Sequence, residues 1–125
     1  MVNHETATAL VATEIRRLEV ELTQTASGRS LCAISKSAGS VPGVKYLEGR
    51  LVAAGELARG LTTNLPCQQA WTLLDSWKHA LERVSQSRFG PDRVAYRAGG
   101  VDELTEIIQL WGCDPPDPTP TEGHD

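Results

Sequence analysis

The sequence predicts an all-α fold, a compact helical bundle without a β-sheet. Leu and Ala supply most of the apolar residues, aromatic residues make up only 5% of the chain, and β-branched residues form no runs. This composition favours helices over strands. Apolar residues also recur every three or four positions through several long segments, which is the spacing of one helix face. The 125 residues are enough for one domain with a modest core.

The first main helix is predicted over residues 5–25. Asn3 is a suitable N-cap, and Glu5 lies in the first turn, where a negative charge suits the helix dipole. Gly28 is expected to end the helix. The following segment is rich in small and polar residues and allows a short helix over residues 31–38. The apolar stripe of the first helix is narrow and suits packing in a bundle; it consists of Ala7, Val11, Ile15, Leu18 and Leu22.

The second main helix is predicted over residues 41–61, with Pro42 in its first turn. Its wide apolar face carries Arg50, flanked by Leu57, and a strip of small residues that includes Gly49. A helix built for stability alone needs neither the arginine nor the glycines, because each internal glycine costs about 1 kcal/mol relative to alanine. We therefore expect another helix, of this chain or of a second copy, to pack closely there.

The third main helix is predicted over residues 66–89, with Asn64 or Leu65 as its cap. Trp71, Lys78 and Phe89 project to one side of its apolar stripe. A tryptophan off the core stripe either packs under a neighbouring segment or is exposed as a binding anchor. The stripe is as wide as that of a core-facing helix, and it consists of Ala70, Leu73, Leu74, Trp77, Ala80, Leu81 and Val84.

Glycines divide the remaining part of the chain. Residues 92–98 are predicted to form a short helical turn closed by Gly99 and Gly100, and Asp102 is predicted to cap a last helix over residues 103–111. Residues 113–125 contain four prolines and almost no apolar residues, so we expect a disordered, acidic tail. The predicted organisation is one helical domain over residues 1–112, made of three main helices and short ones, followed by that tail.

Charge and cysteine content bear on the compartment. Seven of the 16 acidic residues follow Val101, whereas none of the 12 Lys and Arg residues does, so the body is mildly basic and the C-terminal part acidic. The sequence has no apolar run long enough to cross a membrane and no secretory signal pattern. Cys32, Cys67 and Cys113 lie far apart and form no C-x-x-C pair, which predicts reduced, structural thiols and a cytoplasmic location.

Signatures of catalysis are absent from the sequence. It has no Gly-rich phosphate loop and no nucleophile elbow. None of its three histidines pairs at helical spacing with another histidine or a cysteine, and its acidic residues are assigned to solvated faces. The sequence therefore predicts no enzyme, no cofactor and no metal site, unless an enzyme or carrier uses a motif that cannot be recognised.

Residues 30–49 have the outline of a helix-turn-helix, with Ala38 and Gly39 at the turn and a second helix opening at Pro42. Over these 20 residues the chain resembles bacterial helix-turn-helix regulators. The resemblance implies DNA contacts through Arg29, Lys36 and Lys45. The chain departs from the pattern where Gly43 and Val44 replace the polar side chains that usually begin a recognition helix.

We interpret the sequence as a small non-enzymatic module for protein–protein interaction, of the adaptor or accessory kind. The partner is either another protein or a second copy of the chain. A DNA-binding regulator that uses residues 30–50 is the alternative, and an enzyme or carrier without a recognisable motif is the third reading. The predicted partner contacts are Tyr46, Arg50, Leu57, Trp71, Lys78 and Phe89.

Overall fold

A computed structural model gives an all-α bundle of four helices over the residues that it describes, which are 2–28, 42–61, 65–87 and 90–116. The predicted fold class is confirmed. The predicted short helix at 31–38 and the tail from residue 117 onward lie outside the described residues. None of the helices in the described part is long and apolar enough to cross a membrane.

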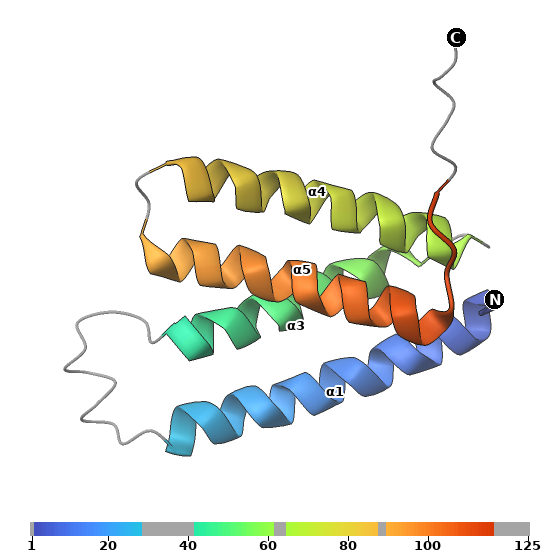
Figure 1. Ribbon diagram of the computed structural model, residues 1–125. Helices are drawn as coiled ribbons and strands as arrows, with labels where there is room; N and C mark the ends of the chain where they lie inside the picture. The colour runs from blue at the N-terminus through green and yellow to red at the C-terminus, as the bar shows by residue number, and fades with distance from the viewer. Residues whose placement is uncertain (1, 29–41, 62–64, 88–89, 117–125) are drawn as a thin grey trace, which may run out of the picture.

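The helices are α1 (His4–Gly28), α3 (Pro42–Gly60), α4 (Pro66–Gln86) and α5 (Pro91–Trp111). Successive helices run in opposite directions, so α3 and α5 point the same way (Figure 1). These two form the central pair and share the most extensive contact, while α1 packs mainly on α3 and α4 mainly on α5. The contact between α3 and α4 is small, so α5 joins them.

The ends of three helices follow the predicted signals closely. Asn3 caps α1, because its Oδ1 accepts a hydrogen bond from the backbone N–H of Thr6 at 2.7 Å. Leu65 precedes Pro66 at the start of α4, where proline costs no hydrogen bond. Gly112 ends α5 with a φ of 71°, a left-handed conformation that glycine adopts without steric cost.

The predicted break at Gly99 and Gly100 is wrong, because α5 continues through both as a single helix from Pro91 to Trp111. Both glycines are buried at close contacts on different sides of α5. A Cβ at Gly99 would overlap the backbone carbonyl of Tyr46 in α3, and one at Gly100 would overlap the ring of Trp77 in α4. The glycines therefore serve helix packing and do not end the helix.

The core lies along the central pair and receives side chains from all four helices. Trp77 is 2% exposed and donates a hydrogen bond from Nε1 to Oε1 of Glu56 at 2.7 Å, which links α4 to α3. The fully apolar centre contains residues of the stripes predicted for the first and third main helices. Its buried members are Ala7, Val11, Leu18, Ala53, Ala54, Leu57, Leu61, Ala70, Leu74, Trp77, Leu104, Ile107, Ile108 and Trp111.

The prediction of reduced thiols is wrong for Cys67 and Cys113, which form a disulfide with a Cα–Cα distance of 5.5 Å. The bond joins the first turn of α4 to the residue that follows the cap of α5. The two cysteines are 46 positions apart, so no local sequence pattern predicts the pairing. Cys32 lies outside the described residues.

Candidate functional site

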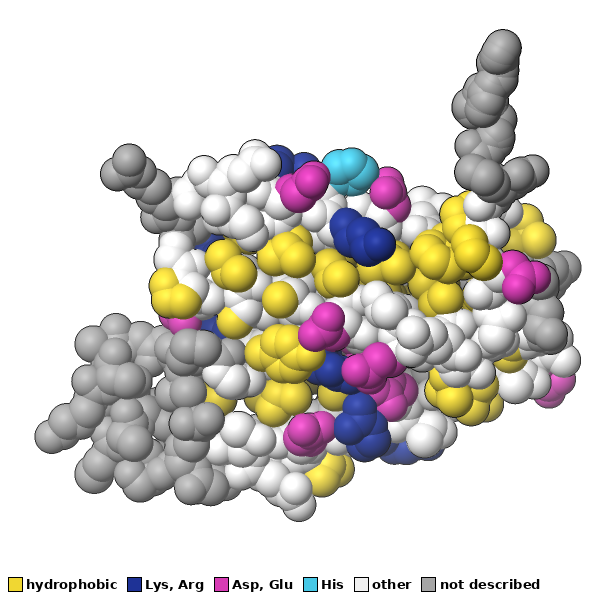
Figure 2. All heavy atoms as spheres, viewed as in Figure 1, with side chains coloured by type: hydrophobic (Ala, Val, Ile, Leu, Met, Phe, Trp, Pro, Cys, Tyr) yellow, Lys and Arg dark blue, Asp and Glu magenta, His cyan; other side chains and the backbone are white. Residues whose placement is uncertain are grey.

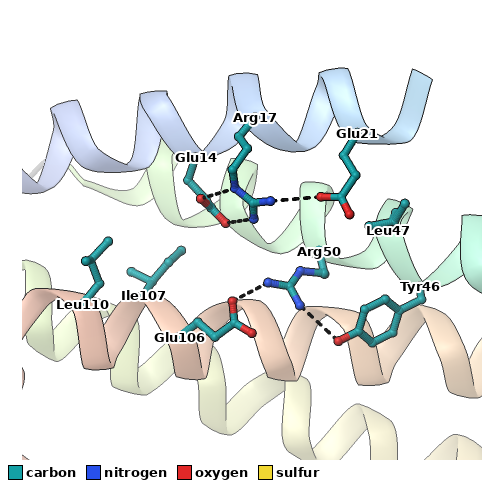
Figure 3. A pocket seen from close by; sticks show the side chains of 9 residues that line it. All are labelled: Glu14, Arg17, Glu21, Tyr46, Leu47, Arg50, Glu106, Ile107 and Leu110. Carbon is teal, nitrogen blue, oxygen red and sulfur yellow. Dashed lines mark hydrogen bonds and ion pairs between the residues drawn. The ribbon is translucent and has the colours of Figure 1, made fainter. Parts of the chain in front are cut away.

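Charged and polar side chains of α1, α3 and α5 meet in a hollow of about 530 Å³ on one side of the central pair (Figure 3). Apolar side chains of Leu47, Ile107 and Leu110 complete its lining. We call the polar group and the two acidic residues beside it the polar cluster. It comprises Glu14, Arg17 and Glu21 on α1, Tyr46 and Arg50 on α3, and Asp102, Glu103 and Glu106 on α5.

The polar cluster forms where α3 and α5 approach each other closely. Gly49 lies against the backbone of Tyr96, and Gly99 lies against the backbone of Tyr46. The expectation that a helix packs closely on the small residues of α3 is confirmed at Gly49, and that helix belongs to the same chain. Because the two backbones touch, the arginine that follows Gly49 reaches carboxylates one and two turns beyond Gly99 on α5.

Arg50 finds its hydrogen-bond partners within the chain, and its side chain is only 11% exposed. Its Nε donates to Oε1 of Glu103 at 3.0 Å and its Nη1 donates to the hydroxyl of Tyr46 at 3.1 Å. Nη2 donates to Glu106, and the Tyr46 hydroxyl in turn donates to Asp102. These bonds explain why an arginine occupies the apolar face of α3.

Glu103 is fully buried, contrary to the expectation that the acidic residues lie on solvated faces. Burial, together with the neighbouring carboxylate of Glu14, raises the pKa of Glu103 to about 8, and Arg50 offsets only part of this rise. The Oε2 atom of Glu103 has no hydrogen-bond partner among the described residues, although Oε1 accepts from Arg50. Two adjacent carboxyl groups therefore differ strongly in proton affinity.

Glu14 is the ionised member of that pair. Arg17 donates to both of its oxygens, with Nε 3.0 Å from Oε1 and Nη2 2.6 Å from Oε2. This two-point hydrogen bond lowers the pKa of Glu14 to about 2. Arg17 also donates to Glu21 at 2.9 Å, so it bridges two turns of α1 (Figure 3).

Sequence reasoning missed Glu103 because it divided α5 at the glycines, and it missed Glu14 because that residue belongs to the site only as the neighbour of Glu103. With a helix starting at Asp102, Glu103 falls in the exposed first turn. With one continuous helix, Glu103 follows Tyr96 and Gly99 at intervals of seven and four residues on the face that meets α3. Reading the stripe through the glycines would have placed a carboxylate among core positions.

A second candidate region runs along the seam of α4 and α5. Figure 2 shows a strip of hydrophobic side chains there, with charged side chains beside it. One hollow of about 620 Å³ is lined by Trp71, which is half-buried, and by Leu74 and Pro116. Another hollow, of about 600 Å³, is lined by Leu81 and Val101. Both hollows are also lined by Asp75 and Lys78, so they adjoin; together we call them the α4–α5 groove.

The structure separates the predicted partner contacts into two places. Tyr46 and Arg50 belong to the polar cluster and Leu57 is 1% exposed in the core, whereas Trp71 and Lys78 line the α4–α5 groove. Their role in binding a partner stays a prediction. Phe89 lies outside the described residues.

Of the predicted DNA contacts, Lys45 is described and Arg29 and Lys36 are not. Lys45 forms an ion pair with Glu48 at 3.0 Å. Together with Arg93 and Arg97 of α5 it lines a small hollow of about 280 Å³. Within the described residues, the region predicted as a helix-turn-helix is represented only by the first half of α3.

No protein-family model, curated protein or solved structure matches this chain at significant similarity.

Proposed function

We propose that the chain is a non-enzymatic helical interaction module that binds a partner protein along the α4–α5 groove. The observation that carries this proposal is the continuity of the groove, whose two hollows adjoin at Asp75 and Lys78. Tryptophan, such as Trp71 at one end, is enriched among the residues that dominate binding energy. Long apolar surfaces rimmed by charged side chains are typical of protein interaction sites.

The charges around the groove favour a basic partner. Asp75, Glu82 and Asp114 place three carboxylates on its lining, against the one ammonium group of Lys78. A partner helix with an apolar stripe and flanking Lys or Arg residues would therefore fit both the shape and the charge. The disulfide supports the groove, because Cys67 lines its wall and is tied to Cys113 at the end of α5.

An affinity pull-down from the native host, followed by titration of the purified partner, tests the proposal. Glu82→Lys reverses one exposed charge of the groove and is expected to weaken a basic partner about tenfold, which corresponds to 1.4 kcal/mol. Trp71→Ala is expected to weaken binding at least as much, because it removes the largest apolar anchor.

Glu19→Lys is the matched control, because it makes the same charge change at an exposed position of α1. It should leave the affinity unchanged. The proposal fails if Trp71→Ala and Glu82→Lys bind the partner as tightly as the unmodified chain. Light scattering separates the two kinds of partner: a dimer that Trp71→Ala dissociates would identify a second copy of the chain.

DNA binding is a second candidate, supported by the basic hollow of Lys45, Arg93 and Arg97 at the start of α3 and α5. Its charge is reduced by Asp92, which also lines it, and the guanidinium of Arg97 stacks 4.7 Å from the ring centroid of Trp77. A regulator would bind duplex DNA with an affinity that falls steeply between about 50 and 200 mM salt. Lys45→Ala should reduce that affinity while Lys78→Ala should not. The absence of duplex binding at low salt would exclude this function.

The cytoplasmic location stays a prediction, and the disulfide counts against it, because disulfides persist mainly in oxidising compartments. Alkylation of the protein extracted from its host, with and without prior reduction, tests this. In an oxidising compartment Cys67 and Cys113 should react only after reduction.

A further inference from the structure

Glu103 is buried at a position where an ionised carboxylate would need more hydrogen-bond donors than the described residues provide. It is fully buried, and its Oε2 atom has no hydrogen-bond partner among the described residues. An ionised carboxylate offers about four lone-pair sites. Arg50 serves one of the two oxygens at 3.0 Å. The other oxygen requires either a proton on the carboxyl group or a cation beside it.

The Glu103 carboxylate belongs to a group of three converging carboxylates. Glu14, Glu103 and Glu106 each place one carboxylate oxygen within 4.8 Å of the other two. Two oxygens bound on opposite sides of Ca²⁺, at about 2.4 Å each, lie about 4.8 Å apart. The three oxygens therefore already lie within the span of one coordination sphere.

The charge of the polar cluster also favours a further cation. Its five carboxyl groups face only two guanidinium groups, those of Arg17 and Arg50. Neither arginine donates a hydrogen bond to Oε2 of Glu103. Arg17 is 51% exposed and holds Glu21 as well as Glu14, so it can shift toward Glu21 when a cation takes part of its place.

Access to the three carboxylates is open from one side. The side chain of Glu106 is 55% exposed, and Glu14 and Glu106 line the hollow of about 530 Å³. Figure 3 shows Glu106 and the Arg17–Glu14 pair facing each other across this hollow from α5 and α1. The space is large enough for waters to complete the six to eight oxygen ligands that Ca²⁺ takes.

We propose that Glu14, Glu103 and Glu106 bind one divalent cation of the class that prefers oxygen ligands, Ca²⁺ or Mn²⁺. Carboxylate oxygens are the donors in this set, and no histidine or cysteine takes part. The cation would join α1 to α5 beside Arg50. The site does not depend on the proposed partner interaction, since none of the three residues lines the α4–α5 groove.

Titration calorimetry and thermal unfolding with Ca²⁺ or Mn²⁺ alone test the site on the full chain after treatment with EDTA. We expect saturable binding of one ion and a melting temperature that rises with ion concentration, because the ion binds the folded state. Glu103→Gln keeps the size of the side chain and should weaken binding at least tenfold. Glu106→Gln changes a half-exposed ligand, so it should fold normally and also weaken binding.

Glu19→Gln is the matched control and should bind as the unmodified chain does, because Glu19 is an exposed residue of α1 outside the cluster. Absence of saturable binding up to about 1 mM ion, the weak end of calcium sites in proteins, would overturn the proposal and leave a proton as the occupant of Glu103. The proposal would also be overturned if Glu103→Gln and Glu106→Gln bound the ion as tightly as the unmodified chain, because the ion would then be held elsewhere.

Discussion

The two flanks of the central α3–α5 pair are closed by different chemistry. On the α4 flank, Trp77 and Leu74 bury apolar surface and the Cys67–Cys113 disulfide ties the helix ends together. On the α1 flank, apolar Val11 and Leu18 share the interface with buried polar groups, chiefly the carboxyl group of Glu103 and its hydrogen-bond donor Arg50. The first flank therefore depends on thiol redox state, whereas the second depends on the protonation of Glu103.

Removal of the disulfide should give the largest loss and should act on the α4 flank. Closing a loop of 46 positions contributes about 4 kcal/mol to stability in the chain-entropy treatment. Cys67→Ala with Cys113→Ala should lower the free energy of unfolding by about this amount, measured in urea. A reducing agent should destabilise the unmodified chain equally and leave the double variant unaffected. Equal stability of all samples would contradict a bonded pair.

Arg50→Met should give the next largest loss and should act on the α1 flank. Methionine retains most of the apolar stem but removes the hydrogen-bond donor of the buried Glu103 carboxyl group, and leaving such a group without its charged partner costs about 3 kcal/mol. The double variant Arg50→Met with Glu103→Leu should recover much of that loss, since the buried carboxyl group that had lost its hydrogen-bond donor is then gone as well. Urea unfolding of both variants at pH 7 measures this; failure of the double variant to recover would show that Arg50 acts through packing.

Adjacent glycines allow the two sides of α5 to be compared directly. Gly99→Ala should cost about 2 kcal/mol, because its Cβ would overlap the backbone of Tyr46, which cannot move without separating α3 from α5. Gly100→Ala should also destabilise the protein, because its Cβ would overlap the ring of Trp77, which is 2% exposed and packed in the core.

Gly55→Ala is the control for helix propensity. Its Cβ would meet only Nη1 of Arg59 at 3.4 Å, so the change should stabilise the protein by about 0.5 kcal/mol. Thermal unfolding of the three glycine variants gives the order. If Gly99→Ala proved as stable as Gly55→Ala, the close contact of α3 with α5 would be wrong.

The pH dependence of stability should give a gradual effect, spread over several pH units, and it reports on Glu103. Its pKa is raised to about 8 in the folded state, so the folded chain holds a proton that the unfolded chain has released. The stabilisation that this proton provides should therefore be complete below the ordinary pKa of a glutamate. It should fall by about 1 kcal/mol per pH unit as the pH rises, and it should be lost once the pH has passed about 8. Glu14, with a pKa lowered to about 2, contributes in the opposite direction, and only below its ordinary pKa.

Urea unfolding from pH 6 to 9 in EDTA measures this dependence. Arg50 and Glu106, the charged neighbours of Glu103, stay unchanged in every variant. Glu103→Gln should remove most of the slope, because the amide does not titrate. Glu19→Gln should keep the slope of the unmodified chain. A slope that is the same in Glu103→Gln would place the titrating group elsewhere.

Periodicity predicted the helices that carry an uninterrupted apolar stripe, and α1, α3 and α4 end within three residues of their expected bounds. It failed at Gly99 and Gly100, because a glycine pair is a reliable stop only where no neighbouring backbone or ring occupies the missing Cβ position. That information lies on Tyr46 and Trp77, far away in the sequence.

The candidate sites were predictable in part for the same reason. Arg50 was recognisable as an anomaly on an apolar face, but its hydrogen-bond acceptor Glu103 lies 53 positions away in a helix that the prediction divided in two. Trp71 and Lys78 were recognisable because they lie off a clean stripe. The neighbours that shape their groove, Val101 and Pro116, come from another part of the chain.

The position of α5 in the chain has a consequence for how the protein is made. This helix is the last of the four to be synthesised, yet it provides most of the contacts that join α3 to α4. A nascent chain that has reached Gln86 therefore leaves the apolar faces of α3 and α4 without their main cover. The bundle can therefore close only after α5 has been synthesised, which makes its folding a late event in the production of the chain.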